Sequence, residues 1–174
     1  MPTASDLDQA IRDVPDFPKP GILFKDITPV LGNAELFATS LQLLAETARG
    51  EKIDKVVGID ARGFIFAAGV AHVLGAGFVP VRKKGKLPWT THERAYTLEY
   101  GEAVVEIHQD AVQPGEKVLL VDDLLATGGT AAASVELLQT LEADLVGISF
   151  LIELQALSGR ELLGKVPVNA LLSY

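Results

Sequence analysis

The sequence predicts an α/β protein with a central, mainly parallel sheet flanked by helices. Short apolar runs alternate along the chain with helical patterns, as where KVVGI at Lys55–Ile59 is followed by a helical pattern at residues 64–74. This alternation is typical of parallel sheets, whose strands are apolar because both faces are buried. With 174 residues, of which 48% are hydrophobic, a single domain accounts for the chain.

The first third of the chain contains two helical patterns and a proline-rich stretch. Residues 5–14 place apolar side chains on one face and predict a short helix, with Ser5 as a candidate N-cap. The prolines of residues 15–31 predict a connector without regular structure. Residues 35–49 predict a longer amphipathic helix that serves as scaffold.

Further elements follow in the rest of the chain. Residues 89–101 alternate polar and aromatic side chains without a core period, which predicts a movable flap between strands. Apolar runs predict strands at residues 77–81, 103–108, 118–121, 145–152 and 168–174, and a short helix is expected at residues 158–163.

Charge and composition exclude several classes of function. The formal net charge of −8 would repel nucleic acids and anionic membranes, so we expect neither as a partner. The absence of cysteine excludes disulfides and thiolate sites and fits a reducing compartment. The acidic start has no basic, apolar signal pattern, and no apolar run is long enough to span a membrane. We therefore expect a cytoplasmic protein.

The most informative stretch is KVLLVDDLLATGGTAAASVELLQTL at residues 117–141. An apolar strand ends at Asp122 and Asp123, and a helical pattern opens near residues 128–130, so the start of this helix faces the two aspartates. A helix N-terminus offers unpaired N–H groups and about half a positive charge, and Thr127 and Thr130 add hydroxyl donors. This arrangement favours a bound phosphate.

Two carboxylates beside a phosphate would repel it, so they need another role. They can accept hydrogen bonds from vicinal ribose hydroxyls or meet a hydrated magnesium ion. The loop lacks the ending of a Walker-type loop, and the chain contains no GxGxxG. An ordinary strand-to-helix turn with acidic residues is the alternative, but the length of the ordered motif favours a ribose phosphate site.

The run VLLVDDLLATGGT resembles the phosphoribosyl pyrophosphate motif of the type I phosphoribosyltransferase family, in its adenine-specific branch. The resemblance implies the type I phosphoribosyltransferase fold with a small N-terminal hood. The domain would span residues 1–174, with the first helix and the hood in residues 1–33. It also implies contacts to the ribose 5-phosphate from Asp122, Asp123, Ala126, Thr127, Gly128, Gly129 and Thr130.

A second strand-loop-helix unit carries the sequence Asp60-Ala61-Arg62-Gly63. Loops at the carboxyl ends of parallel strands meet over one crevice, so this loop should lie near residues 122–130. Arg62 is a surface residue in the simplest alternative, but arginine at a helix start is disfavoured without an anion. The loop resembles the family's pyrophosphate loop, which commonly contains a strained non-proline peptide bond. Asp60, Ala61 and Arg62 are thus predicted pyrophosphate contacts, with Arg62 also catalytic.

The densest cationic stretch is RKKGKLP at residues 82–88. A charge run is usually solvated surface, but this one again follows a strand end and resembles the family's pyrophosphate-side segment. Lys83 and Lys86 are the predicted pyrophosphate contacts, and Lys84 is expected to be exposed.

The connector at residues 15–31 carries the apolar residues Ile22, Leu23 and Phe24 between prolines, where a flat heterocycle could bind. The segment resembles the family's hood, which implies that Phe24 stacks on adenine. Leu23 and Lys25 would read the edge of the base through their main chains, although family members often carry arginine at the Lys25 position.

The flap ends in LEYG, which resembles the family's catalytic loop. The resemblance implies that Glu99 is the catalytic carboxylate that handles the purine proton. Tyr100 would contact the pyrophosphate or close the flap. Glu153 resembles a family position near the purine and is a secondary candidate.

The expected reaction joins adenine and phosphoribosyl pyrophosphate to give AMP and pyrophosphate. Mg²⁺ is the expected cofactor and shields the pyrophosphate, with no protein residue assigned as its direct ligand; the histidines show no ligand spacing. The resemblance also implies a homodimer. Two alternatives stay open: transfer to another purine such as xanthine or guanine, and a non-catalytic sensor of phosphoribosyl pyrophosphate.

Overall fold

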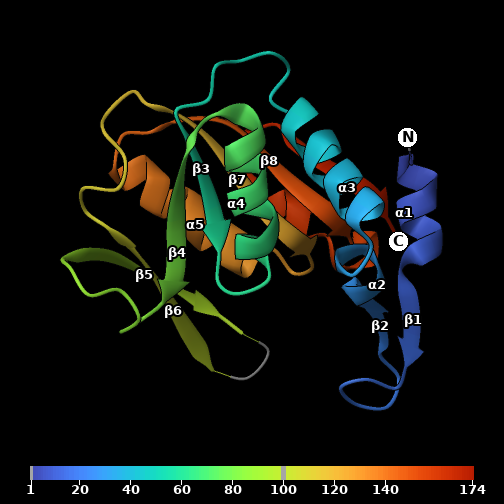
Figure 1. Ribbon diagram of the computed structural model, residues 1–174. Coiled ribbons are helices and arrows are strands. Elements are labelled where there is room, and N and C mark those ends of the chain that lie inside the picture. Colours follow the sequence, from blue (N-terminus) through green and yellow to red (C-terminus); the bar gives the residue numbers. More distant parts are fainter. Residues whose placement is uncertain (1, 99–100) are drawn as a thin grey trace.

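A seven-stranded sheet forms the centre of the molecule (Figure 1). The structure is a computed structural model that describes residues 2–98 and 101–174. The strand order is β5-β6-β4-β3-β7-β8-β9; β3, β4, β7, β8 and β9 are parallel, and β5 and β6 form an antiparallel hairpin at one edge. The strands are β3 (Lys55–Ile59), β4 (Gly77–Lys83), β5 (Thr91–Thr97), β6 (Glu102–His108), β7 (Lys117–Leu125), β8 (Asp144–Glu153) and β9 (Val168–Ser173). The predicted α/β class with a mainly parallel sheet is confirmed.

Helices cover both faces of this sheet (Figure 1). On one face, α1 (Ala4–Ala10), α3 (Ala34–Glu46) and α4 (Gly63–Leu74) pack on Val56, Leu119 and Val121. On the other face, α5 (Gly129–Thr140) packs on alternate strand residues, among them Val57 and Leu120. Because successive strand residues point to opposite faces, these continuous apolar runs fill both cores.

The N-terminal segment differs from the prediction of a helix over residues 5–14. The α1 helix ends at Ala10, and Arg12–Pro15 forms β1, which pairs antiparallel with β2 (Leu23–Asp26). The N-cap is Thr3, which exchanges hydrogen bonds with Asp6. The proline-rich connector also contains β2 and the short helix α2 (Thr28–Leu31), so the expectation of no regular structure there was wrong. Pairing between β1 and β2 outweighs the helical spacing of residues 11–14.

The segment predicted to be a flap is largely the edge strand β5, paired along its length with β6. Most of its side chains are partly or fully exposed, which explains the missing core period. At the other end of the chain, the short helices η1 (Gln155–Leu157) and η2 (Gly159–Leu163) connect β8 to β9. In Figure 1 the two chain ends lie near each other beside α1.

Within the described residues, no helix combines the length and the apolar character needed to cross a membrane.

Candidate active site

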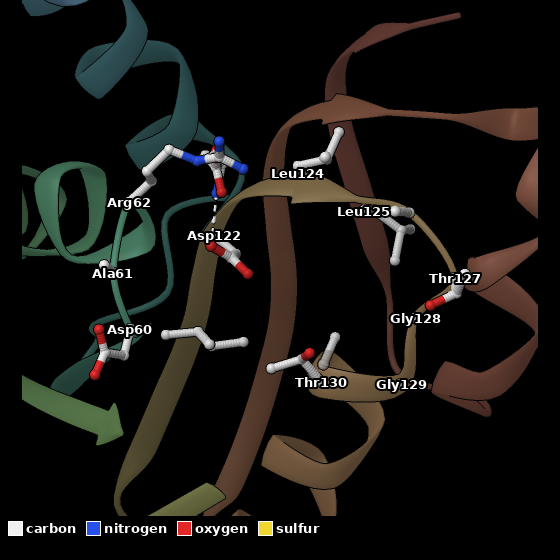
Figure 2. A pocket seen from close by; sticks show the side chains of 14 residues that line it. Asp60, Ala61, Arg62, Asp122, Leu124, Leu125, Thr127, Gly128, Gly129 and Thr130 are labelled. Atoms are coloured by element: carbon white, nitrogen blue, oxygen red, sulfur yellow. Dashed lines mark hydrogen bonds and ion pairs between the residues drawn. The ribbon is translucent and has the colours of Figure 1, made fainter. Parts of the chain in front are cut away.

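A cavity of about 400 Å³ opens at the carboxyl ends of β3 and β7. It is lined by residues 59–62 and 122–131. Figure 2 shows Asp60, Ala61 and Arg62 on one side of Asp122, and Thr127 and Thr130 on the other side. The prediction that these two loops meet is therefore confirmed, and it follows from the parallel pairing of β3 with β7.

The start of α5 forms the floor of the cavity on the Thr130 side. Its N-cap is Gly128, at a φ of 84°, and a glycine has no side chain that could cap the helix amides. These amides are therefore available for an anion. The ring of Tyr96, on β5, lies beside this helix start, with Cδ2 3.2 Å from the position of a β-carbon on Gly129. Only the pairing of β5 brings Tyr96 here, so sequence inspection missed it.

Asp122 is half-buried in the cavity wall, and its Oδ1 accepts a hydrogen bond of 2.8 Å from the backbone N–H of Asp123. A β-carbon on Gly63 would overlap Oδ1 and lie 3.2 Å from Cγ of Asp122, so α4 can begin this close to β7 only with glycine at position 63. Burial, followed by the charge of Asp123, raises the pKa of Asp122 well above its ordinary value.

Asp123 is buried and forms an ion pair with Arg62, whose Nε lies 2.6 Å from Oδ2 of Asp123. The same guanidinium lies 5.7 Å from the ring centroid of Phe24 in the hood. Arg62 retains 47% of its side-chain exposure, so one face of the cation remains open to a ligand. The arginine thus connects the pyrophosphate loop, the ribose loop and the hood.

Asp60 is held by Arg82, whose Nε lies 3.3 Å from Oδ2 of Asp60 and whose Nη1 donates to the carbonyl of Lys86 at 3.1 Å. The peptide bond between Asp60 and Ala61 is cis. Lys83 and Lys86 are exposed and are not among the residues that line the cavity.

The cationic stretch is shaped by Glu106, a buried residue of β6. Its Oε1 accepts backbone hydrogen bonds from Lys86 at 2.9 Å and Leu87 at 2.8 Å. Lys84 points away to an exposed ion pair with Glu93, at 2.9 Å. The sequence of β6 gave no hint that Glu106 was buried, because a carboxylate ordinarily faces solvent.

In the hood, β2 has a ladder partner on one edge only, which leaves main-chain groups on its other edge for a ligand. The ring of Phe24 packs edge-on against Phe17, at 5.1 Å between centroids, and Leu23 is exposed. The side chain of Lys25 binds Asp13 at 2.6 Å and lies 3.8 Å from the ring centroid of Tyr174. Lys25 is therefore fixed within the hood, and only its main chain remains for a base.

Glu153 does not present a free carboxylate. Its oxygens are bound by Nε and Nη2 of Arg160, at 3.0 and 2.5 Å. Because Arg160 occupies both oxygens, Glu153 serves as a contact between β8 and η2 in this structure. Glu99 and Tyr100 lie outside the described residues. Among the described residues, no group of three or more His, Cys, Asp or Glu side chains is placed to hold a metal ion.

Known proteins resemble this chain over nearly its whole length. Residues 32–168 match the phosphoribosyl transferase domain. An adenine phosphoribosyltransferase of Acidothermus cellulolyticus is 59% identical over 162 residues, covering 93% of this chain and 92% of the relative. The crystal structure of an adenine phosphoribosyltransferase from Rhodothermus marinus superposes with a TM-score of 0.93 at 53% identity, covering 98% of each chain.

The adenine phosphoribosyltransferase of Saccharomyces cerevisiae, solved with adenine and an imino-altritol bisphosphate, superposes with a TM-score of 0.91. It is 44% identical and covers 97% of each chain. Both the matched domain and the shared fold place the cavity described above in a phosphoribosyltransferase. The chain belongs to the phosphoribosyl transferase domain family and, within it, to the adenine phosphoribosyltransferases.

Proposed function

We propose that the protein transfers the phosphoribosyl group of phosphoribosyl pyrophosphate to adenine, giving AMP and pyrophosphate. The carrying observation is the single cavity that combines the residue 60–62 loop with the β7 aspartates and the start of α5. It provides anion-binding amides, carboxylates and a cation within one space, as a ribose that carries a phosphate and a pyrophosphate requires. The names of the relatives, and the adenine bound to the yeast enzyme, support the choice of base.

The ribose 5-phosphate would bind between the start of α5 and the end of β7. The phosphate accepts hydrogen bonds from the amides that follow Gly128 and from the hydroxyls of Thr127 and Thr130. Asp122 and Asp123 bind the ribose hydroxyls. Ala126 and Gly129 contribute main chain, since both lie in the wall of the cavity.

The pyrophosphate would lie toward Arg62 and the main chain of Asp60 and Ala61, with Lys83 and Lys86 adding charge from the side. Tyr100 completes this end in our proposal. Mg²⁺ would be held by pyrophosphate oxygens and water, with no protein residue as a direct ligand, which suits a cation that keeps several waters and takes oxygen ligands. Its role is to neutralise charge on the leaving group.

Adenine would stack on Phe24 and meet the open main-chain edge of β2 at Leu23 and Lys25. The bond from the anomeric carbon to pyrophosphate breaks through a dissociative transition state, and pyrophosphate leaves with the electron pair. The purine nitrogen forms the new bond from the opposite face, and its proton goes to Glu99. Arg62 stabilises the departing charge, while Asp122 and Asp123 hold the ribose in line.

We also propose a homodimer in the cytoplasm. Exposed apolar residues on α4 and β4, among them Ile65, Val73 and Phe78, offer an apolar surface for a second copy. The absence of cysteine suits a reducing compartment.

The test is an incubation of the purified protein with Mg²⁺ and phosphoribosyl pyrophosphate, with and without adenine. We expect AMP and pyrophosphate in equal amounts when adenine is present and no turnover without it. Tight binding of phosphoribosyl pyrophosphate that is never consumed, whichever purine is added, would instead identify a sensor.

A further inference from the structure

The backbone of Gly159 lies directly against the loop that precedes α5. A β-carbon on Gly159 would overlap the carbonyl oxygen of Ala126 and lie 2.8 Å from the nitrogen of Gly128 and 2.9 Å from the carbonyl carbon of Thr127. In the opposite direction, a β-carbon on Gly128 would overlap the carbonyl oxygen of Gly159. Two stretches of main chain therefore meet without any side chain between them.

The segment that carries Gly159 is anchored to the sheet by the next residue. Arg160 binds both oxygens of Glu153 at the end of β8, and its Nη1 donates to the carbonyl of Val168 on β9 at 2.6 Å. Leu163, at the other end of η2, is buried in the core beneath α5. Because both ends of η2 are fixed, a side chain added at position 159 would displace the loop rather than η2.

We propose that Gly159 is a positioning residue for the phosphate loop at residues 126–130. Its main chain supports the loop from behind and sets the direction of the amides at the start of α5. Arg160 and Glu153 hold that support in place. The inference rests on the proposed function, because it takes the ligand of these amides to be the 5-phosphate of phosphoribosyl pyrophosphate.

The physical reason is the angular dependence of hydrogen bonds. N–H donation weakens steeply once the angle at hydrogen falls below about 120°, so a small rotation of the loop affects several donors together. Adenine would not be affected, since its proposed contacts lie in the hood at Phe24 and in β2. A change at Gly159 should therefore separate the two substrates.

The first test is Gly159→Ala. We expect its KM for phosphoribosyl pyrophosphate to rise about tenfold or more, as when a hydrogen bond to a charged group is lost, with the KM for adenine within about twofold of the unsubstituted protein. The matched control is Gly147→Ala on β8, where a β-carbon would meet its nearest neighbours at ordinary distances of 3.5 and 3.7 Å. The control should leave both KM values unchanged.

A second variant guards against misfolding of the first. Arg160→Lys adds no atom beside the loop, but it loses the bidentate contact to Glu153 and the bond to Val168. We expect the KM for phosphoribosyl pyrophosphate to rise about threefold. The melting temperature should fall by less than it does when a substitution creates a cavity in the core.

Calorimetric titration with ribose 5-phosphate provides a readout that does not need turnover. The affinity for ribose 5-phosphate should fall in Gly159→Ala and stay unchanged in Gly147→Ala. Equal ribose 5-phosphate affinity in folded Gly159→Ala and unsubstituted protein would overturn the inference, as would equal losses for both substrates. If the unsubstituted protein bound ribose 5-phosphate but did not convert adenine, the proposed function would fail while this inference still stood.

Discussion

Nε of Arg62 lies 2.6 Å from Oδ2 of Asp123, and the same guanidinium lies 5.7 Å from the ring centroid of Phe24. A residue assigned to pyrophosphate thus neutralises a carboxylate assigned to ribose and contacts the residue assigned to the base. The Arg62 side chain keeps 47% of its exposure, so a ligand can bind its open face while these contacts are in place. We infer that the three parts of the site are linked through one side chain rather than built independently.

Replacement of Asp123 by asparagine tests the ribose end of this link. The amide cannot balance Arg62 or accept hydrogen bonds as a carboxylate does, so we expect kcat/KM to fall about a hundredfold or more. The melting temperature should change little, since Arg62 is half-exposed and can turn to solvent. Asp144→Asn, at the exposed start of β8, is the control. Near-normal turnover in Asp123→Asn would remove the ribose assignment.

Substitutions of Phe24 test the proposed stacking of adenine. Phe24→Ala removes the ring on which adenine would stack, so the KM for adenine should rise about tenfold, whereas Phe24→Trp should restore most of the loss. The KM for phosphoribosyl pyrophosphate serves as the internal reference and should stay within about threefold in both variants. An unchanged adenine KM in the alanine variant would rule out stacking.

Glu99 lies outside the described residues, so its role depends on kinetics. Glu99→Gln keeps the shape and removes the proton acceptor, and we expect kcat to fall about a hundredfold with little change in substrate KM. The opposite pattern, weaker binding at a preserved kcat, would mean that Glu99 binds substrate without moving a proton.

Glu106 predicts how the stability of the fold depends on pH. Burial raises the pKa of this carboxyl, but the backbone N–H groups of Leu87, Gly85 and Lys86 outweigh burial and hold the pKa below its ordinary value of 4.5. A carboxyl with a depressed folded-state pKa contributes stability that is present above its unfolded-state pKa and lost as the pH falls through the folded-state value.

Denaturant unfolding at pH 7, 5 and 4 should therefore show a loss of unfolding free energy below about pH 5. Glu106→Gln keeps an acceptor oxygen but cannot titrate, so its loss over the same range should be smaller. Identical pH dependence in the two proteins would show that Glu106 does not contribute.

Local pattern predicted the fold well where burial decides the structure. The apolar runs at Lys55–Ile59 and at residues 118–121 became strands of the central sheet, because continuous apolar residues are stable there only when buried on both faces. The second strand continues to Leu125, beyond its predicted end at Asp122 and Asp123, because β7 stays paired with β8 up to Leu125. The helical spacing of residues 11–14 misled the prediction, since pairing of β1 with β2 is a long-range contact that local spacing does not contain. Edge strand β5 had no core period because most of its side chains are partly or fully exposed.

The site divides in a similar way. The sequence motif and the positions of two strand ends were enough to predict that Arg62 lies near Asp122 and Asp123. The contacts of Glu106 with the cationic stretch and of Gly159 with the phosphate loop join segments distant in sequence, so neither residue had a local signal. The pairing of Glu153 with Arg160 likewise depends on how η2 folds back on β8.

The most direct measurement is a competition among bases in one reaction. The protein is incubated with Mg²⁺, phosphoribosyl pyrophosphate and equal concentrations of adenine, guanine, hypoxanthine and xanthine, and the nucleotides are separated and counted. We predict that AMP is the dominant product. The edge of adenine differs from that of 6-oxopurines in its pattern of hydrogen-bond donors and acceptors, and the proposed main-chain contacts of β2 match the adenine pattern. A predominance of GMP, IMP or XMP would contradict the assignment of adenine as the substrate.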